Sequence, residues 1–346
     1  MIAFMAWSST TYKPKWRSGE TMVIRVPRPL VPQVMEYARK LDRKCPPGKQ
    51  IVLPGVEIPP KLRRSKPVNV ASVPLRSPFR YPGGKTWLVP YVRQWLSSIR
   101  KPDVFVEPFA GGGIVSLTAA FEDLANHVVM AEIDECVSGV WQTILSGQAE
   151  WLARRILTFD LTKDNVVKAL SRSNRKSLTL KERAFLTILR NRVQRGGIMA
   201  PGAGLVKAGE NNKGIASRWY PQTLAKRIRQ IAQNSAAISF FNGDGFVLFD
   251  HFGGDRKSVF FVDPPYTKAA KRLYNNWQFD HRRLFGILRS LRADYLVTYD
   301  NTPQIRGLAD EFGLDYRPVR MKNTHHAQMT ELLIGKDFEW FDAIAE

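Results

Sequence analysis

The sequence predicts an α/β protein whose mixed seven-stranded sheet is interrupted by a long, mainly helical insertion. Three observations carry this prediction. From Arg80 onward, short apolar runs of strand length alternate with helix-length segments, which is typical of a sheet covered by helices. Residues 141–235 show helical periodicity. A glycine-rich loop follows the first strand and precedes a helical segment, as at the ligand-binding edge of doubly wound sheets.

Seven apolar runs rich in β-branched and aromatic residues are the predicted strands. Most are separated by helix-length segments, which favours parallel neighbours. The last two runs are joined only by a short loop, so we expect an antiparallel pair at the sheet edge and therefore a mixed sheet. The seven runs are residues 103–107, 127–132, 237–241, 258–262, 294–299, 315–320 and 329–334.

The insertion divides the α/β part of the chain into residues 76–140 and residues 236–346. Between them, residues 141–235 contain four segments with apolar side chains at helical spacing, and a glycine-rich, basic section at 195–218. An insertion of this length predicts a separate recognition domain. Its predicted helices are residues 147–158, 163–172, 180–193 and 221–234.

Residues 1–75 differ in composition from the rest and form a basic, proline-rich N-terminal extension. Residues 21–26 have strand character, and residues 30–41 place apolar side chains at helical spacing. A strand followed by a helix is similar to a ribbon-helix-helix DNA-binding unit, and an accessory strand and helix packed on the main domain is the alternative. We expect a monomer, with a dimer formed through this extension as the alternative.

The positive charge of the chain indicates a polyanionic partner. The sequence has 52 basic and 31 acidic residues, which gives a formal net charge of +21. Such a field favours nucleic acid, and a generally solubilising charge or attraction to an acidic membrane are the alternatives. No apolar run reaches the roughly 18 residues of a membrane-spanning helix, so we expect no membrane partner.

The two cysteines, Cys45 and Cys136, lie far apart without CxxC spacing or a histidine cluster. This distribution predicts neither a disulfide framework nor a zinc site, and we expect no bound metal. The first residues lack the basic leader and the long apolar core of a secretory signal. We therefore expect the protein in the reducing cytoplasm.

A strand, a glycine loop and an acidic residue form a predicted cofactor site. Gly111 and Gly113 lie between the strand at 103–107 and a helical segment at 114–121, and their lack of Cβ atoms lets the backbone approach a ligand. Glu132 ends the next strand, a position from which a carboxylate accepts hydrogen bonds from ribose hydroxyls. A dinucleotide is one candidate ligand. The FxGxG spacing favours a single nucleoside moiety, and S-adenosylmethionine meets that description.

Asp263, Pro264, Pro265 and Tyr266 follow the apolar strand at 258–262. The Asp263 carboxylate and the Pro264 carbonyl would be two acceptors held rigid by prolines, and Tyr266 offers a flat ring face. Such a site suits a planar amine, for example the NH2 group of a base that stacks on Tyr266. A strand followed by a simple Pro-Pro turn is the alternative.

Three motifs together resemble the alpha group of adenine-N6 DNA methyltransferases, the Dam type. They are Tyr81-Pro-Gly-Gly-Lys85, Glu107-Pro-Phe-Ala-Gly-Gly-Gly113 and Asp263-Pro-Pro-Tyr266, in the order found in that family. The resemblance extends from Pro78 to Ile334. It implies a Rossmann-like methyltransferase fold, S-adenosylmethionine as methyl donor, and a DNA-recognition domain at 141–235.

The resemblance also implies a role for each matching residue. Lys85 would lie near the methionine carboxylate and Glu132 would hold the ribose. Asp244 would meet the adenine amino group of the cofactor, although an aspartate in a turn after a strand is nearly as good an interpretation. The implied cofactor-binding residues are Tyr81, Lys85, Glu107, Phe109, Gly111, Gly113, Glu132, Asp244 and Asp263, and the implied catalytic residues are Asp263, Pro264, Pro265 and Tyr266.

Basic residues of the insertion and of the segment after Tyr266 are the predicted DNA contacts. In the insertion, Arg190-Asn191-Arg192 and the stretch from Gly214 to Pro221 resemble the same family more loosely, so no recognition sequence is implied. An exposed loop is the alternative, and His325 and His326 are a further candidate substrate contact. The predicted DNA contacts are Arg190, Arg192, Arg195, Lys207, Lys213, Arg218, Lys268, Lys271 and Arg272.

The predicted function is methylation of the N6 amino group of adenine in duplex DNA, by base flipping and direct displacement. Neither cysteine lies in a Pro-Cys motif that would form a covalent intermediate. Methylation of cytosine N4 or of RNA adenine is one alternative, because the pocket argument concerns an NH2 group. A catalytically silent DNA-binding protein is another. The sequence leaves open whether the enzyme acts alone or beside a companion restriction endonuclease.

Overall fold

The structure is a computed structural model that describes residues 31–44, 70–80, 84–172, 177–197, 203–266, 279–322 and 328–344. The chain divides into two compact units, Met1–Arg63 and Arg64–Glu346, and each is described by itself. In the first unit the described element is helix α1 (Val31–Lys44), which confirms the helix predicted at 30–41. The strand predicted at 21–26 lies outside the described residues.

A seven-stranded sheet forms the centre of the second unit, in the order β3-β2-β1-β4-β5-β7-β6. The order places β1 and β4 at the centre, where both faces are covered, and their side chains are apolar accordingly. All seven predicted strands are confirmed to within two residues at each end. Their bounds are β1 (Val104–Glu107), β2 (His127–Glu132), β3 (Ile238–Asn242), β4 (Ser258–Val262), β5 (Asp294–Asp300), β6 (Asp315–Lys322) and β7 (Gln328–Gly335).

The sheet is mixed, as predicted. The five strands β3, β2, β1, β4 and β5 are parallel to one another, whereas β7 is antiparallel to both β5 and β6. The β6–β7 pair is in register from Asp315 and Gly335 to Lys322 and Gln328, which confirms the antiparallel pair at the sheet edge. Because β7 runs antiparallel to β5, its first residues lie beside the carboxyl end of β5, with Glu331 opposite Asp300.

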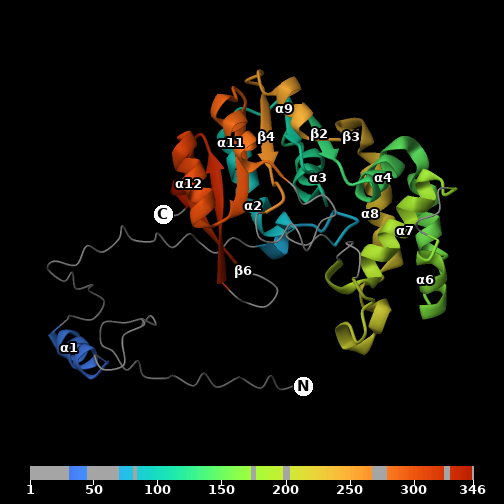
Figure 1. Cartoon of the computed structure of the whole chain (residues 1–346), viewed down its shortest axis with the longest axis horizontal. Helices are drawn as coiled ribbons and strands as arrows, with labels where there is room; N and C mark the ends of the chain where they lie inside the picture. The colour runs from blue at the N-terminus through green and yellow to red at the C-terminus, as the bar shows by residue number, and fades with distance from the viewer. Residues whose placement is uncertain are drawn as a thin grey trace, which may run out of the picture. The chain divides into compact units, whose positions relative to one another are not determined.

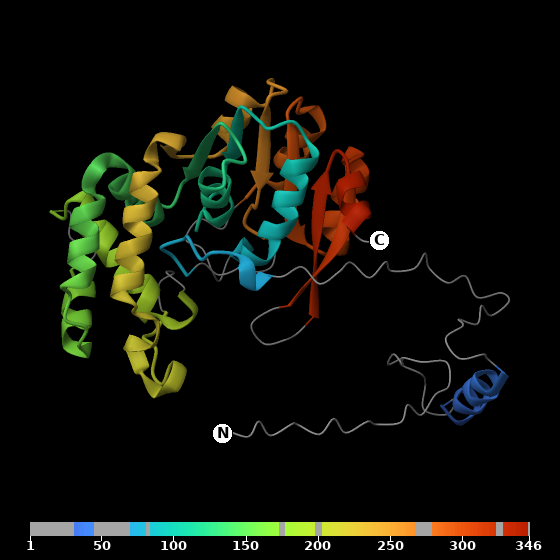
Figure 2. The same ribbon diagram turned by 180° about the vertical axis from the view of Figure 1, so that it is seen from behind.

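Helices cover both faces of the sheet (Figures 1 and 2). Successive side chains on a strand point to opposite faces, so Phe105 belongs to one apolar cluster and Val106 to the other. The Phe105 face packs against α2 (Val89–Ser98), α3 (Ile114–Phe121) and α13 (Glu339–Ile344), and the Val106 face packs against α9 (Phe246–Phe252), α11 (His281–Ser290) and α12 (Pro303–Phe312).

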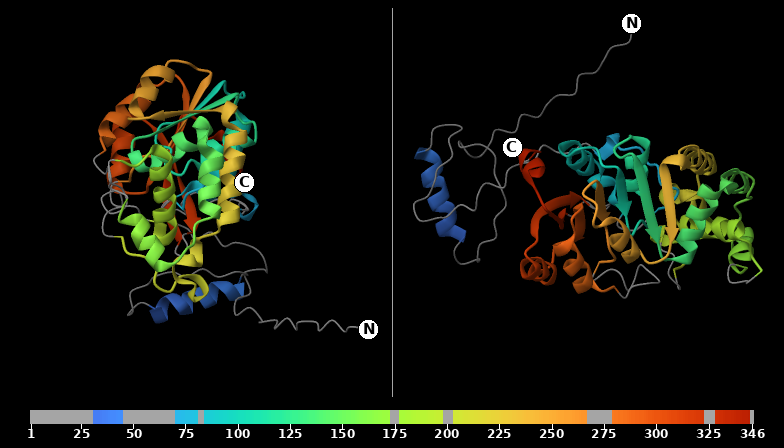
Figure 3. Two further views of the ribbon diagram at one scale, coloured as in Figure 1. Left: turned by 90° about the vertical axis from the view of Figure 1, so that its right-hand side faces the viewer. Right: turned by 90° about the horizontal axis from the view of Figure 1, so that it is seen from above.

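The insertion forms helices beside the β3 edge of the sheet (Figures 1 and 3). The four helices predicted there are confirmed as α5 (Ala149–Leu157), α6 (Lys163–Leu170), α7 (Leu180–Val193) and α8 (Pro221–Gln233), and α4 (Glu135–Thr143) leads into them from β2. Their buried side chains, including Leu152, Ile188 and Ile228, belong to the same cluster as Phe105. The insertion therefore shares its core with the sheet, and a separate recognition domain at 141–235 stays a prediction.

Several helices begin at side chains that accept hydrogen bonds from free backbone N–H groups. Asp134 caps α4 and Asp280 caps α11. Thr302 caps α12, whose first residue is Pro303. A capping box between Thr179 and Glu182 opens α7. These caps fix where the helices start, and the cap of α4 lies only two residues after the predicted ribose acid Glu132.

Short helical turns complete the described chain. Lys85 opens one of them, so the backbone that carries this residue is locally ordered. The turns are η2 (Val70–Ser72), η3 (Lys85–Leu88), η4 (Ile144–Gln148), η5 (Arg195–Gly197), η6 (Glu210–Asn212), η7 (Gly214–Arg218) and η8 (Ser235–Ala237). Among the described helices, none has the length and apolar character needed to cross a bilayer.

Candidate active site

The glycine loop after β1 is fixed by its backbone conformation and by a tryptophan. Gly111 and Gly113 have φ angles of 48° and 61°, which glycine adopts without steric cost. A Cβ atom on Gly113 would lie 2.9 Å from the Trp141 ring, so a side chain there would displace that ring. Trp141 Nε1 also donates a hydrogen bond to the Gly111 carbonyl at 3.0 Å. The loop therefore needs glycine at both positions.

Glu132 links the end of β2 to the glycine loop. Its Oε2 accepts a hydrogen bond from the Gly111 backbone N–H at 2.9 Å, and its Oε1 accepts one from the Asp134 N–H at 2.8 Å. The side chain is buried, and burial raises the pKa of this carboxyl to about 7. A carboxylate has about four acceptor sites, so Glu132 can also accept from a ligand hydroxyl. The geometry is compatible with the predicted ribose contact.

Glu107 has a structural partner at the start of α3. Its Oε2 accepts a hydrogen bond from the Ser116 backbone N–H at 2.9 Å. The residue that precedes α3 is Gly113, which has no side chain to cap the helix. Glu107 therefore supplies a cap from the neighbouring strand. The side chain is buried, and burial raises the pKa of the carboxyl to about 8.

Asp244 lies in a turn that packs against the glycine-loop region. A Cβ atom on Gly245 would be 1.9 Å from the Pro108 carbonyl oxygen, so the loops after β3 and β1 are in direct contact. Asp244 Oδ1 accepts a hydrogen bond from the Phe246 N–H at 3.0 Å, as the turn interpretation predicts. The Phe109 and Phe246 ring centroids lie 5.6 Å apart. Two packed aromatic rings thus lie beside the exposed Asp244 carboxylate.

Asp263 is held by two side chains at the carboxyl end of β4. Thr298 Oγ1 donates a hydrogen bond to Asp263 Oδ1 at 2.8 Å. Lys85 Nζ lies 2.9 Å from Asp263 Oδ2, and the lysine side chain is only 4% exposed. A charge-assisted contact in such a place is strong and orients the carboxylate. Lys85 was expected near the methionine carboxylate, and its contact with Asp263 was not predicted.

Tyr266 joins the same cluster through its hydroxyl group. It donates a hydrogen bond to Glu331 Oε2 at 2.8 Å, and Glu331 Oε2 lies 3.9 Å from Lys85 Nζ. The Lys85 ammonium lies 4.8 Å from the centroid of the Tyr266 ring. Burial raises the pKa values of both the Tyr266 hydroxyl and the Glu331 carboxyl. Two carboxylates therefore share one buried lysine beside a neutral tyrosine.

Thr298 and Glu331 are site residues that the sequence did not reveal. Each lies within a predicted strand, and a hydroxyl or carboxylate in a strand is most often solvent-facing. Glu331 directly precedes the apolar run Leu332 to Ile334 on β7, which is the one signal that could have drawn attention to it. Both side chains are buried in the structure. Their partners come from β4 and from the turn at Lys85, which only the fold brings together.

The predicted DNA contacts do not all occupy the same environment. Arg195, Lys207 and Lys213 are exposed. Arg218 forms an ion pair with Glu210. Lys268, Lys271 and Arg272, together with Tyr81, His325 and His326, lie outside the described residues.

Arg192 differs from the expectation. Its side chain is only 5% exposed, and a terminal guanidinium nitrogen donates to the Pro78 carbonyl at 2.5 Å. Burial lowers the pKa of this guanidinium to about 9. Asn191, Arg192 and Val193 are all buried on the last turn of α7, so this turn faces inward. It is an internal packing residue and not a surface contact for DNA.

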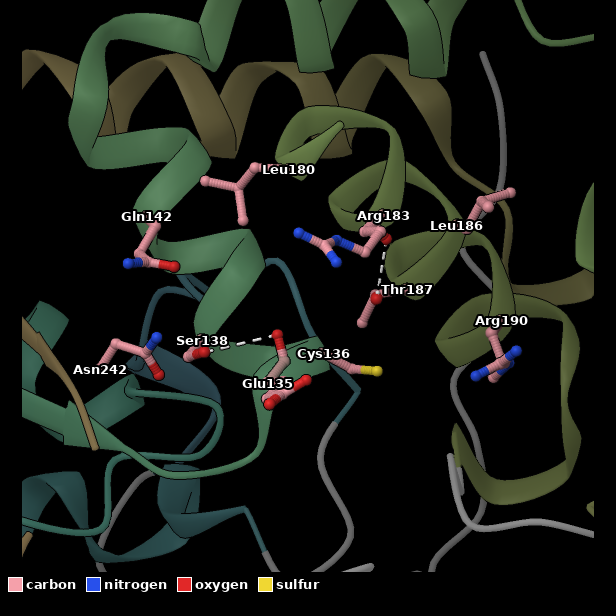
Figure 4. A pocket seen from close by; sticks show the side chains of 10 residues that line it. All are labelled: Glu135, Cys136, Ser138, Gln142, Leu180, Arg183, Leu186, Thr187, Arg190 and Asn242. Carbon is pink, nitrogen blue, oxygen red and sulfur yellow. Dashed lines mark hydrogen bonds between the residues drawn. The ribbon is translucent and has the colours of Figure 1, made fainter. Parts of the chain in front are cut away.

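Arg190 lines a cavity of about 360 Å³ between α4 and α7 (Figure 4). Glu135 and Cys136 line it from α4, and Arg183 lines it from α7. Burial raises the pKa of the Cys136 thiol, so the reactive thiolate is disfavoured there. The cavity walls thus present two arginines toward the start of α4. In the described residues, no group of three or more His, Cys, Asp or Glu side chains could hold a metal ion.

A glycine loop, an acid at the end of β2, and an Asp-Pro-Pro-Tyr element at the end of β4 lie together at one edge of a mixed seven-stranded sheet. This combination defines the class of nucleoside-binding α/β methyltransferases. Within that class, the chain belongs to the family of D12 class N6 adenine-specific DNA methyltransferases, which it matches over residues 81–322. It is therefore an adenine-specific DNA methyltransferase that depends on S-adenosylmethionine.

Solved structures with a similar fold include other methyltransferases. A Pyrococcus horikoshii protein named as an RNA methyltransferase has a TM-score of 0.33 and 13% identity, over 74% of this chain and 84% of its own. The rRNA methyltransferase AviRa from Streptomyces viridochromogenes has a TM-score of 0.32 and 13% identity, over 74% and 86%. These similarities are too distant to bear on the substrate. No curated protein matches the chain significantly.

Proposed function

We propose that the enzyme methylates an adenine that has been turned out of duplex DNA, and that Asp263 orients the N6 amino group. The observation that carries this proposal is the fixed Asp263 carboxylate. Thr298 donates to one of its oxygens and Lys85 contacts the other. Each oxygen retains a lone pair for a further donor. Together with the Pro264 carbonyl, Asp263 can therefore accept both hydrogens of an amino group.

The cofactor would occupy the glycine-loop region. When bound, S-adenosylmethionine supplies an electrophilic methyl group on a positively charged sulfur. Glu132 would accept from the ribose, and the backbone at Gly111 and Gly113 permits close approach. The packed aromatic rings of Phe109 and Phe246 are suited to contact with a purine ring. The residues present fit a nucleoside of this kind.

The side chains around Asp263 would act on the amino group and its proton. Hydrogen bonds to the amino hydrogens draw the nitrogen lone pair out of conjugation with the ring. Lys85 stabilises the negative charge on Asp263, which keeps the carboxylate an acceptor. The proton that leaves N6 would pass to Asp263 or to solvent. Direct transfer needs no cysteine nucleophile, and the raised pKa of the half-buried Cys136 thiol is consistent with that.

Tyr266 would provide the stacking face for the extruded base. Its ring is partly exposed, and its hydroxyl is anchored on Glu331. Extrusion of a base costs a few kcal/mol, so stacking and the basic DNA interface must offset this cost. The exposed cations Arg195, Lys207 and Lys213 of the insertion would contribute phosphate contacts. Duplex DNA would then lie along the insertion side of the glycine-loop edge.

The alternatives differ in their support. Methylation of cytosine N4 or of RNA adenine would use the same NH2 geometry, and the family match favours adenine in DNA. A catalytically silent protein would have no need to keep Lys85, Asp263 and Tyr266 in one contact network. Binding of S-adenosylmethionine to the purified protein separates a silent protein from an enzyme.

Replacement of Asp263 by alanine tests the proposed function. We expect transfer of tritiated methyl groups to DNA to fall by about 10²-fold to 10³-fold or more, because the amino group loses its charged acceptor. Binding of S-adenosylmethionine should remain close to that of the wild type. The matched control is Asp250→Ala, which removes an exposed carboxylate on α9 and should leave transfer unchanged. Normal transfer by D263A would reject the assignment.

A further inference from the structure

The last turn of α7 holds the backbone of residues 77–80, which precede the turn at Lys85. Asn191 Nδ2 donates to the Arg80 carbonyl at 2.9 Å, and Asn191 Oδ1 accepts from the Arg80 N–H at 2.8 Å. Asn191 Nδ2 also donates to the Gly197 carbonyl at 2.9 Å. The side chain is fully buried. Because the Arg80 N–H can only donate, the orientation of this amide is fixed by its partners.

Two arginines of the insertion also bind the backbone of residues 77–80. Arg192 donates to the Pro78 carbonyl at 2.5 Å, and Arg227 Nη1, on α8, donates to the Ser77 carbonyl at 3.1 Å. Segment 77–80 is therefore bound by its main chain to two helices of the insertion. Such contacts fix backbone position and are indifferent to the side chains that the segment carries. Both Asn191 and Arg192 are buried, so their side chains are not presented to DNA.

The other side of segment 77–80 contacts the glycine loop. Ser77 Oγ donates to the Gly112 carbonyl at 2.5 Å. The Phe79 ring centroid lies 5.8 Å from that of Trp141, and Trp141 in turn binds the Gly111 carbonyl. Segment 77–80 thus lies between the insertion helices and the loop that the cofactor is expected to approach. A displacement of the segment would therefore shift two consecutive glycines of that loop, Gly111 and Gly112.

We propose that Asn191 and Arg192 are positioning residues for the cofactor loop, acting through the backbone of residues 77–80. This inference rests on the proposed function only in taking Gly111 to Gly113 as the S-adenosylmethionine loop. It assigns different roles to the three residues of the Arg190-Asn191-Arg192 motif. Arg190 lines the cavity between α4 and α7, while the two residues that follow it secure the cofactor side of the molecule. The insertion thereby supports cofactor binding as well as DNA binding.

The test is binding of S-adenosylmethionine by the full-length Asn191→Ala protein in the absence of DNA. We expect the dissociation constant to rise about tenfold, because the Arg80 N–H and carbonyl both lose their Asn191 partner and the segment shifts. Affinity for duplex DNA without cofactor should stay within about twofold of the wild type. Arg190→Ala is the reciprocal control on the same helix: DNA affinity should fall and cofactor affinity should not.

A second variant distinguishes the positioning role from a general loss of folding in N191A. Ser77→Ala removes the hydrogen bond to Gly112 at the far end of the segment and leaves α7 intact. We expect it to weaken cofactor binding about threefold, and the effects of N191A and S77A together should be less than additive. If N191A or S77A weakens DNA binding and leaves cofactor binding unchanged, the positioning role is wrong. If the wild-type protein binds no S-adenosylmethionine, the proposed function fails instead.

Discussion

The glycine-loop region and the Asp263 region both contain a pair of carboxyl groups, but they hold them differently. Glu107 and Glu132 accept hydrogen bonds from backbone N–H groups. Asp263 and Glu331 are held by side chains and share the Lys85 ammonium. Backbone donors bring no full charge, so burial dominates and raises the pKa of Glu107 to about 8. The carboxyl groups of the cofactor region are thus held by the main chain, and those of the catalytic region by side chains, among them the charged Lys85.

This difference predicts what a single substitution would disturb. A change in the glycine-loop region alters the conformation of a loop, and should appear mainly as lost cofactor affinity. A change in the Asp263 region alters the orientation or charge of reacting groups, and should appear mainly in the rate of transfer. The two regions also differ in their effect on stability at high pH. A buried carboxyl without a charged partner must lose its proton as the pH rises, and this loss destabilises the folded state.

Glu132→Gln should give the largest effect on the cofactor side. The amide NH2 of glutamine would face one of the two backbone donors, Gly111 N–H or Asp134 N–H, and leave it without an acceptor. We expect the dissociation constant for S-adenosylmethionine to rise about 30-fold to 100-fold in calorimetry. Glu135→Gln, an exposed change at the start of α4, is the matched control. Equal affinities in the two variants would contradict the ribose assignment.

Glu331→Gln should affect transfer with little change in cofactor affinity. Glutamine still offers an oxygen to the Tyr266 hydroxyl but removes a negative charge beside Lys85. We expect kcat to fall about tenfold, with an unchanged KM for S-adenosylmethionine. Thr330→Ala is the control, since Thr330 precedes Glu331 on β7 and is exposed. A selective rise in that KM would move Glu331 from the catalytic side to the cofactor side.

Glu107→Gln should give the smallest of these effects, a change in how the stability of the protein depends on pH. Between its ordinary pKa of 4.5 and the folded pKa of about 8, the folded state keeps a proton that the unfolded chain releases. Stability from this group is therefore full below pH 4.5 and is lost as the pH rises through about 8. From about pH 5 to about pH 8, the wild-type Tm should drop relative to E107Q by about 3 °C or more. Parallel melting curves across this range would contradict the shift.

The elements of the fold were largely predictable because they depend on local patterns. Apolar runs gave all seven strands, and helical spacing gave α5 to α8. The antiparallel pair of β6 and β7 followed from the short loop between them. What could not be predicted were contacts between distant residues. Asp263 was identified from its motif. Thr298 carries no local signal and Glu331 only its place beside an apolar run, and both gain their roles from strand order.

Arg192 also shows that contacts between distant residues could not be predicted, here for a residue that the sequence did single out. Its charge and its place in a basic insertion predicted a DNA contact, because an arginine on a helix is usually solvent-exposed. The packing of α7 against residues 77–80 instead buries it on a backbone carbonyl. Which face of a helix meets solvent depends on its neighbours, and these neighbours lie more than a hundred residues earlier in the chain.

By itself, the sequence determined the strands and helices, the glycine loop, the acid at the end of β2 and the Asp-Pro-Pro-Tyr element. These features follow from periodicity, from backbone freedom and from the order of motifs, all of which are written in neighbouring residues. Only the tertiary structure decided that Lys85 contacts Asp263, that Glu331 anchors Tyr266, and that Asn191 and Arg192 hold segment 77–80. Buried polar side chains must find partners, and the fold alone determines which partners are within reach.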